Sequence, residues 1–265
     1  MPIVLRSYAE PLRTFQDNII GTANVLEAAR HAASVRATVI VTSDKVYRNR
    51  ETGQAYREDD PLGGLDPYSA SKAAAEIVTQ SMIASFFREQ EGKTAASVRA
   101  GNVIGGGDWA EYRLLPDAAR ALSRGDDLLV RNPDSTRPWQ HVLEPVSGYL
   151  MLAEEMLGGD VQGYDAWNFG PEIEDALPVA EVAELFVREW GGNAAWRREN
   201  ADSVGLHEAK LLSVDSSRAR DFLQWRPRWS VQESVKRTAR WYKDAHDGAD
   251  ANLLLDRDID AYLEI

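Results

Sequence analysis

The chain has 265 residues, of which 44% are hydrophobic, so it can bury a sizeable core and we expect one large or two ordinary domains. Its 30 Lys and Arg against 42 Asp and Glu give a net charge of −12, which argues against nucleic acid as a partner. The lack of cysteine excludes disulfides and thiolate chemistry, and the lack of a long apolar run or signal peptide predicts no membrane association and a cytoplasmic location.

The first part of the chain alternates between helical and strand patterns. Apolar residues recur at helical spacing from Glu10 to Ala33, which predicts an amphipathic helix. The β-branched run from Val35 to Thr42 predicts a buried parallel strand. A polar loop from Arg48 to Asp66, a helix from Pro67 to about Glu91 and a second strand from Ala95 to Val103 follow. This order predicts a right-handed β-α-β unit in a doubly wound parallel sheet of an α/β protein.

The character of the sequence changes beyond Gly107. The predicted elements become shorter, and all eight tryptophans lie at or after Trp109. We therefore expect a second, smaller α/β region there. The predicted helices are Leu114 to Arg124, Glu144 to Leu157, Val179 to Trp190 and Val231 to His246. Strands are predicted near Leu128 to Arg131 and Ala166 to Phe169.

A tyrosine and a lysine stand four residues apart near the start of the second predicted helix. Tyr68 and Lys72 therefore share one helix face. An ammonium group beside a phenol favours the phenolate, which is the form that a catalytic base for alcohol oxidation requires. In isolation the pair is a weak signal, and an exposed helix pair is the simpler interpretation.

Three polar residues at the end of the first predicted strand strengthen the catalytic interpretation. Ser43, Asp44 and Lys45 follow that strand directly. The carboxyl end of a parallel strand lies beside the start of the following helix, so these groups and the tyrosine should face one crevice. The alternative is a loop in which Asp44 caps the next turn and Lys45 is solvated. We favour convergence on one site.

Four longer segments resemble the extended short-chain dehydrogenase/reductases, and within them the nucleotide-sugar 4,6-dehydratases of the CDP-glucose group. The segments are residues 42–47 (TSDKVY), 56–64 (YREDDPLGG), 99–109 (RAGNVIGGGDW) and 137–145 (RPWQHVLEP). The resemblance covers nearly the whole chain. It implies a partial Rossmann-like NAD-binding domain over residues 1–108 and a mainly substrate-binding domain over 109–265, with about 138–170 returning to the Rossmann sheet.

The resemblance also implies a lyase reaction in deoxysugar biosynthesis that converts CDP-glucose to CDP-4-keto-6-deoxyglucose. Tyr68, assisted by Lys72 and Ser43, would take the proton of the C4 hydroxyl while hydride passes to NAD, and Tyr68 and Lys72 would also contact the cofactor. Asp44 is the candidate acid for the departing C6 hydroxyl. Lys45 is the candidate base for the C5 proton, provided that its pKa is lowered. Hydride would then return to C6.

Other residues have two interpretations each. By analogy Asn102 would face the substrate diphosphate, and the alternative is a plain turn residue. Arg137 can bind a diphosphate bidentately, and the resemblance favours that role. Asn18 matches an asparagine that the superfamily uses behind its active site, although a solvent-facing helix position is also consistent. His141 and His207 have no second ligand at metal spacing, so we expect no metal site. The three glycines from 105 to 107 are interpreted as a flexible turn on the substrate side.

The glycine fingerprint of a dinucleotide fold is absent from this sequence. The match to the family begins partway through its cofactor domain, so we expect that the opening β-α-β units, roughly 80 residues, are missing and that cofactor binding is weak. Three hypotheses follow: a dehydratase whose chain is incomplete, a related epimerase or dTDP- or GDP-sugar dehydratase, and an inactive remnant that binds nucleotide sugar or a partner. Asp44 and Lys45 argue against an epimerase. The resemblance further implies a homodimer through the two long helices.

Overall fold

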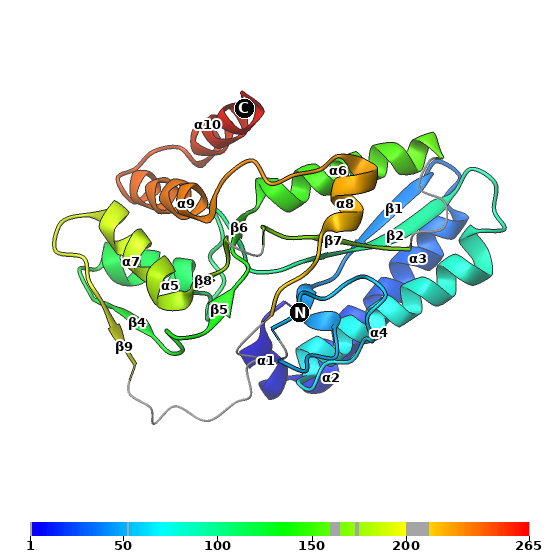
Figure 1. The fold of residues 1–265 in the computed structure, drawn as a ribbon, viewed down its shortest axis with the longest axis horizontal. Helices are drawn as coiled ribbons and strands as arrows, with labels where there is room; N and C mark the ends of the chain where they lie inside the picture. Colours follow the sequence, from blue (N-terminus) through cyan, green and yellow to red (C-terminus); the bar gives the residue numbers. More distant parts are fainter. Residues whose placement is uncertain (1, 52, 160–164, 173–174, 200–211, 265) are drawn as a thin grey trace. The chain divides into compact units, whose positions relative to one another are not determined.

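The computed structural model describes residues 2–51, 53–159, 165–172, 175–199 and 212–264 (Figure 1). The chain divides into two compact units. The first unit comprises Met1–Gly101, Val146–Gly170 and Leu212–Arg226, and the second comprises Asn102–Pro145, Pro171–Leu211 and Pro227–Ile265. Within the described ranges no helix has both the length and the apolar character needed to cross a membrane.

The first unit is built on a parallel sheet of three strands. Its strands are β1 (Ala37–Val41), β2 (Thr94–Ala100) and β7 (Ala166–Phe169), in the order β1-β2-β7. Val39 of β1 pairs with Ala96 of β2, and Val98 of β2 pairs with Trp167 of β7. The α/β fold with a parallel sheet that the sequence predicts is thereby confirmed.

Helices cover both faces of this sheet (Figure 1). On one face, α3 (Gly21–His31) and η3 (Ile83–Phe87) pack against Ile40 and Ala95. On the other face, the part of α6 (Leu143–Gly158) that belongs to the first unit and α8 (Ser217–Leu223) pack against a second cluster. That cluster includes Ala96, Val98, Leu152, Met156, Trp167, Phe169, Leu223 and Trp225. The arrangement accounts for strands that are apolar on both sides.

Both long helices predicted in the first unit contain a π-helical turn. The segment predicted from Glu10 to Ala33 consists of α2 (Pro11–Phe15), the π-helix η1 (Gln16–Ile20) and α3. The segment predicted from Pro67 consists of α4 (Pro67–Met82) and the π-helix η3. Periodicity predicts the helices but not the single extra residue that a π turn accommodates. The sequence also failed to predict the short helices α1 (Val4–Ala9) and α8.

The predicted strand from Ala95 to Val103 is wrong at its end. Strand β2 stops at Ala100, and Val103–Ile104 forms a separate strand, β3, which pairs with β6 (Gln140–His141). Asn102, between them, has a φ of 34°, in the left-handed region that a β-strand does not accommodate. The apolar residues before Gly101 and Val103 after it continue the strand pattern of the sequence, so the prediction places one strand across this break.

The second unit has its own core between three helices. The helices are α5 (Leu114–Ser123), α7 (Val179–Trp190) and α9 (Val231–His246), and all three were predicted to within about two residues. The Ser230 hydroxyl accepts the Glu233 N–H at 3.2 Å and begins α9. Short strand pairs complete the unit: β4 (Leu128–Val130) with β9 (Trp196–Arg198), and β5 (Thr136–Arg137) with β8 (Leu177–Pro178).

Close packing accounts for two of the three consecutive glycines. A Cβ atom on Gly106 would lie 2.1 Å from the ring of Trp241 on α9, and one on Gly105 would lie 2.8 Å from Val142. No side chain fits at these distances. Packing against Val142 and against Trp241 of α9, rather than the expected flexibility, therefore accounts for these two glycines.

A buried carboxylate ties the C-terminal helix α10 (Ala251–Leu263) into the second unit. Glu144 is fully buried and accepts hydrogen bonds from the backbone N–H groups of Arg228 at 3.0 Å and Trp229 at 2.8 Å. Its third donor is the hydroxyl of Tyr262 on α10, at 2.8 Å. Burial raises the pKa of the Glu144 carboxyl, which these donors partly offset.

We expect Tyr262→Phe to lower the free energy of unfolding by about 1.5–3 kcal/mol, because it removes one of three donors to a buried carboxylate. Urea unfolding measures the change. The matched control is Tyr112→Phe, because Tyr112 is 52% exposed and a surface substitution should stay within about 0.5 kcal/mol. Equal losses in the two variants would contradict a structural role for the Tyr262 hydroxyl.

Candidate active site

The first candidate residues follow β1 in a short turn. Ser43 has an extended backbone, and its Oγ accepts the Lys45 N–H at 3.2 Å, which caps the 3-10 helix η2 (Asp44–Val46). The same hydroxyl donates to Asp44 Oδ1 at 3.0 Å. Ser43, and not Asp44, is therefore the capping residue, so the alternative that Asp44 serves only as a cap is wrong.

Asp44 is buried, with 2% of its surface exposed. Its Oδ1 accepts the Ser43 hydroxyl, whereas its buried Oδ2 has no hydrogen-bond partner in the described part of the chain. An unsatisfied buried carboxylate oxygen is costly and needs an explanation such as a functional role. Burial raises the pKa of Tyr149 on α6, and the charge of Asp44 raises it further, so this tyrosine lies within the electrostatic reach of Asp44.

Tyr68 and Lys72 lie on the first turns of α4. Asp66 caps this helix by accepting the Ser69 N–H at 2.9 Å. Tyr68 is buried, and its backbone N–H donates to the Ser7 hydroxyl at 3.2 Å. Lys72 Nζ donates to the carbonyl of Val41, the last residue of β1, at 3.2 Å. Lys72 and the Ser43 turn therefore meet at the carboxyl end of the same strand, as the sequence predicts.

Burial lowers the pKa of the Lys72 ammonium below its usual value, and the carboxylate of Glu76, one turn further along α4, partly opposes this effect. Lys45 on η2 is partly buried, as is Lys72.

Asn18 lies behind the first turn of α4, on the π-helix η1. It is buried, and its Nδ2 donates to the Ser71 hydroxyl at 2.8 Å. Ser71 in turn donates to the backbone carbonyl of Tyr68 at 2.7 Å. The alternative of a solvent-facing Asn18 is therefore wrong, and this side chain supports the turn that carries Tyr68.

The remaining candidates lie in the second unit. Asn102 has a left-handed backbone, and its carbonyl accepts the Gln140 N–H at 3.4 Å. Arg137 is buried on β5, and its Nη1 donates to the Thr136 carbonyl at 3.1 Å. His141 is buried, and its Nδ1 accepts the Leu143 N–H at 3.3 Å. His207 lies outside the described residues.

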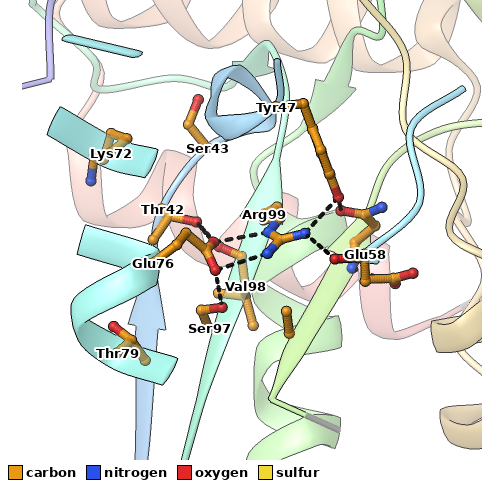
Figure 2. A network of polar contacts seen from close by, with 12 residues as sticks. Thr42, Ser43, Tyr47, Glu58, Lys72, Glu76, Thr79, Ser97, Val98 and Arg99 are labelled. Atoms are coloured by element: carbon orange, nitrogen blue, oxygen red, sulfur yellow. Dashed lines mark hydrogen bonds and ion pairs between the residues drawn. The ribbon is translucent and has the colours of Figure 1, made fainter. Parts of the chain in front are cut away.

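Sequence reasoning missed a fully buried ion pair beside the candidate residues (Figure 2). Arg99 of β2 donates from Nε to Glu76 Oε1 and from Nη2 to Oε2, both at 2.9 Å. The hydroxyls of Thr42 and Ser97 donate to the same carboxylate, at 2.5 Å and 2.6 Å. The signals were an arginine inside an apolar strand and a glutamate four residues after Lys72.

The hydrogen-bond network continues from Arg99 to the segment after η2 (Figure 2). Arg99 Nη1 donates to the Tyr47 hydroxyl at 2.8 Å and to the Glu58 carbonyl at 3.0 Å. Tyr47 in turn donates to Asn168 Oδ1 at 2.6 Å. Burial alone would raise the pKa of Glu76, but the hydrogen bonds and charge of Arg99, together with the two hydroxyls, hold it below its usual value. Both partners are therefore charged.

The sequence is similar to those of known proteins. The family model for GDP-mannose 4,6 dehydratase matches residues 1–238. A CDP-glucose 4,6-dehydratase of Salmonella typhimurium (strain LT2) is 43% identical over 266 residues, which cover 99% of this chain and 74% of that relative.

Solved structures share the fold. A UDP-galactose 4-epimerase superposes with a TM-score of 0.74 at 25% identity, over 94% of this chain and 76% of that one. A dTDP-glucose 4,6-dehydratase from Bacillus anthracis, in complex with NAD, superposes with a TM-score of 0.70 at 19% identity, over 88% and 70% of the two chains. The Rossmann-like fold expected from the sequence is confirmed.

The start of α4 depends on Gly64, which gives the next prediction. A Cβ atom on Gly64 would lie 2.1 Å from the Ser69 Cβ and 2.5 Å from its backbone carbonyl carbon. We expect Gly64→Ala to lower the free energy of unfolding by about 1–3 kcal/mol through overpacking, measured by urea unfolding. Gly21→Ala is the matched control: Gly21 is helical with open space around it, so alanine should stabilise by up to about 1 kcal/mol. A loss at both positions would show that packing at Gly64 is not the cause.

Proposed function

The chain belongs to the GDP-mannose 4,6-dehydratase family, and from this membership we propose that its substrate is CDP-glucose. It is a nucleotide-sugar 4,6-dehydratase, a lyase that uses NAD. The proposal of this substrate rests on the similarity to the CDP-glucose 4,6-dehydratase over 99% of this chain. The product is the 4-keto-6-deoxy sugar, formed by oxidation at C4 and loss of water across C5 and C6.

NAD supplies a hydride acceptor at C4 and a hydride donor at C6, so the reaction has no net redox change. The donors at the carboxyl end of β1 fit such a cofactor, because open parallel sheets bind dinucleotides at that edge. Lys72 holds an ammonium group there, within hydrogen-bond distance of Val41. We propose that Tyr68 and Lys72 contact the cofactor.

We propose that Tyr68 takes the proton of the C4 hydroxyl. Its position on the first turn of α4, one turn before Lys72, supports this role, because a nearby ammonium group stabilises a phenolate. The Ser43 hydroxyl, at the end of the same strand that Lys72 contacts, would hold the C4 oxygen by a hydrogen bond. The Asn18 and Ser71 contacts keep the first turn of α4 in place.

Once C4 carries a ketone, the C5 proton becomes acidic and water can leave from C6. We propose that Asp44 donates the proton to the departing hydroxyl, a role supported by its burial and its unpartnered Oδ2. We propose that Lys45, next to it in the sequence and less buried, takes the C5 proton and returns it to C5 when hydride is delivered to C6.

The second unit is the proposed binding region for the nucleotide part of the substrate. We propose that Asn102 and Arg137 contact its diphosphate. The left-handed backbone at Asn102 and the planar guanidinium of Arg137 support these roles, because strained backbone is often found at ligand sites and arginine binds phosphates bidentately. This assignment retains the division into a cofactor region and a mainly substrate-binding region.

We also propose a homodimer through α2, η1, α3 and α4. Large apolar side chains are exposed on these helices, namely Leu12, Ile20, Val25 and Ile77, with exposed fractions of 53–82%. Apolar groups of this kind favour an interface. Light scattering should give twice the chain mass for the unmodified protein and the chain mass for Ile77→Glu. A monomer at every concentration would contradict the proposal.

The reaction is tested by mass spectrometry of CDP-glucose incubated with the protein and NAD. We expect a product lighter by one water. Tyr68→Phe and Asp44→Asn should each lower the rate by about 10²–10⁴-fold, because each removes a proton-transfer group. Tyr112→Phe and Asp126→Asn are the matched controls at exposed positions and should retain the rate. An isomer of unchanged mass, separated by chromatography, would indicate an epimerase, and no product would contradict the dehydratase assignment.

A further inference from the structure

We propose that Glu76 and Arg99 form a positioning pair, which holds the helix turn that carries Tyr68 and Lys72 in register with the strand-end turn that carries Ser43, Asp44 and Lys45. This inference rests on the proposed function. Neither member of the pair is proposed to touch the substrate. The pair acts through the backbone segments to which it is bonded and through its charges.

The contacts on the helix side begin with Glu76, which is one helical turn after Lys72. Both of its carboxylate oxygens are bonded to Arg99 of β2 in a bidentate arrangement. This geometry fixes the rotation of α4 and its position along β2, because a shift of either element breaks both hydrogen bonds. The position of Lys72 along the sheet is fixed with it.

The contacts on the strand-end side hold both ends of residues 43–46. Thr42, immediately before Ser43, donates its hydroxyl to Glu76 at 2.5 Å and its backbone N–H to Val98 at 2.8 Å. Tyr47, immediately after Val46, accepts a hydrogen bond from Arg99 at 2.8 Å. The turn with the proposed acid and base is therefore bonded at one end to each member of the ion pair (Figure 2).

The pair also sets the electrostatic potential at Lys72. Both members are fully buried, so water does not screen them as it screens surface charges. The Glu76 carboxylate attracts the Lys72 ammonium. The titratable groups nearest to the pair also include Asp44 and Lys45 on η2, Tyr68 on α4, and Tyr47 and Glu58 beside Arg99. Arg6, Arg13, Asp17 and Glu27 on α1, α2, η1 and α3 are exposed.

The charges predict opposite effects when the two partners are neutralised one at a time. Glu76→Gln removes a negative charge, which lowers the pKa of both Lys72 and Tyr68. We expect both limbs of the pH profile of kcat/KM to move to lower pH by about one unit. Arg99→Gln removes a positive charge and should move both limbs to higher pH by a similar amount. In the double variant the net charge is restored, and the profile should return to within about 0.3 units of that of the unmodified protein.

Glu144→Gln is the matched control. Glu144 is a carboxylate as fully buried as Glu76 and has three hydrogen-bond donors, but it lies in the second unit, outside the proposed machinery. It should lower stability without moving the pH profile. If the Glu76 and Arg99 variants lose activity only in proportion to their folded fraction, with unmoved profiles, the positioning role is overturned.

A pair of hydroxyl variants tests the mechanical part while both charges are retained. Thr42→Val and Ser97→Ala each remove one short hydrogen bond to Glu76, but only Thr42 adjoins Ser43. We expect kcat to fall about tenfold or more in Thr42→Val. The fold-loss of kcat in Ser97→Ala should be at least about five times smaller, and the pH profile should not move in either variant. Equal losses in the two variants would overturn the positioning of the turn.

NMR titration of ¹⁵N-labelled lysines separates this inference from the proposed function. The chain has six lysines, and the Lys72 signal is assigned by its loss in Lys72→Arg. Its midpoint should fall in Glu76→Gln and stay in Glu144→Gln. If the unmodified protein yields no dehydrated product but the titration midpoint of Lys72 falls in Glu76→Gln, the proposed function fails while the electrostatic coupling stands. An unmoved Lys72 midpoint in a folded Glu76→Gln protein overturns the coupling.

Discussion

The first unit depends on one constraint: two opposite charges, Arg99 and Glu76, are removed entirely from water and must satisfy each other. Removing ions from water costs several kcal/mol each, and a buried pair recovers this only with good geometry and further hydrogen bonds. Here every carboxylate oxygen has two donors, and the guanidinium bonds to Tyr47 and a carbonyl as well. An apolar replacement often matches such a pair in stability. Unlike an apolar contact, the pair requires α4 and β2 to align so that both of its hydrogen bonds form.

The two units solve the same problem of a buried carboxylate in different ways. Glu76 faces a cation, and its pKa falls below the usual value. Glu144 accepts hydrogen bonds from two backbone N–H groups and the Tyr262 hydroxyl, and burial raises its pKa although the charge of Arg228 opposes this effect. At Glu144 the hydrogen bonds and the charge of Arg228 do not offset desolvation, whereas the paired Arg99 and two hydroxyls do so at Glu76.

Much of the first unit could be predicted from the sequence because its signals are local. The apolar strand from Val35, the helix from Pro67, and the meeting of Lys72 with the Ser43 turn follow from periodicity and from the geometry of parallel sheets. The Glu76–Arg99 contact joins residues 23 apart, and the Tyr262–Glu144 contact joins residues 118 apart. No local pattern encodes such pairings.

The π-helical turns have a consequence for how this protein tolerates change in length. Each π turn holds one residue more than an α-helical turn, so the helix faces before and after it are out of phase by about 100°. Within η1 that offset coincides with Asn18, which is bonded to Ser71. Loss of one residue there would leave a regular helix whose inner and outer faces no longer match their surroundings. Helical phase, and not only residue identity, is thus under constraint beside the site.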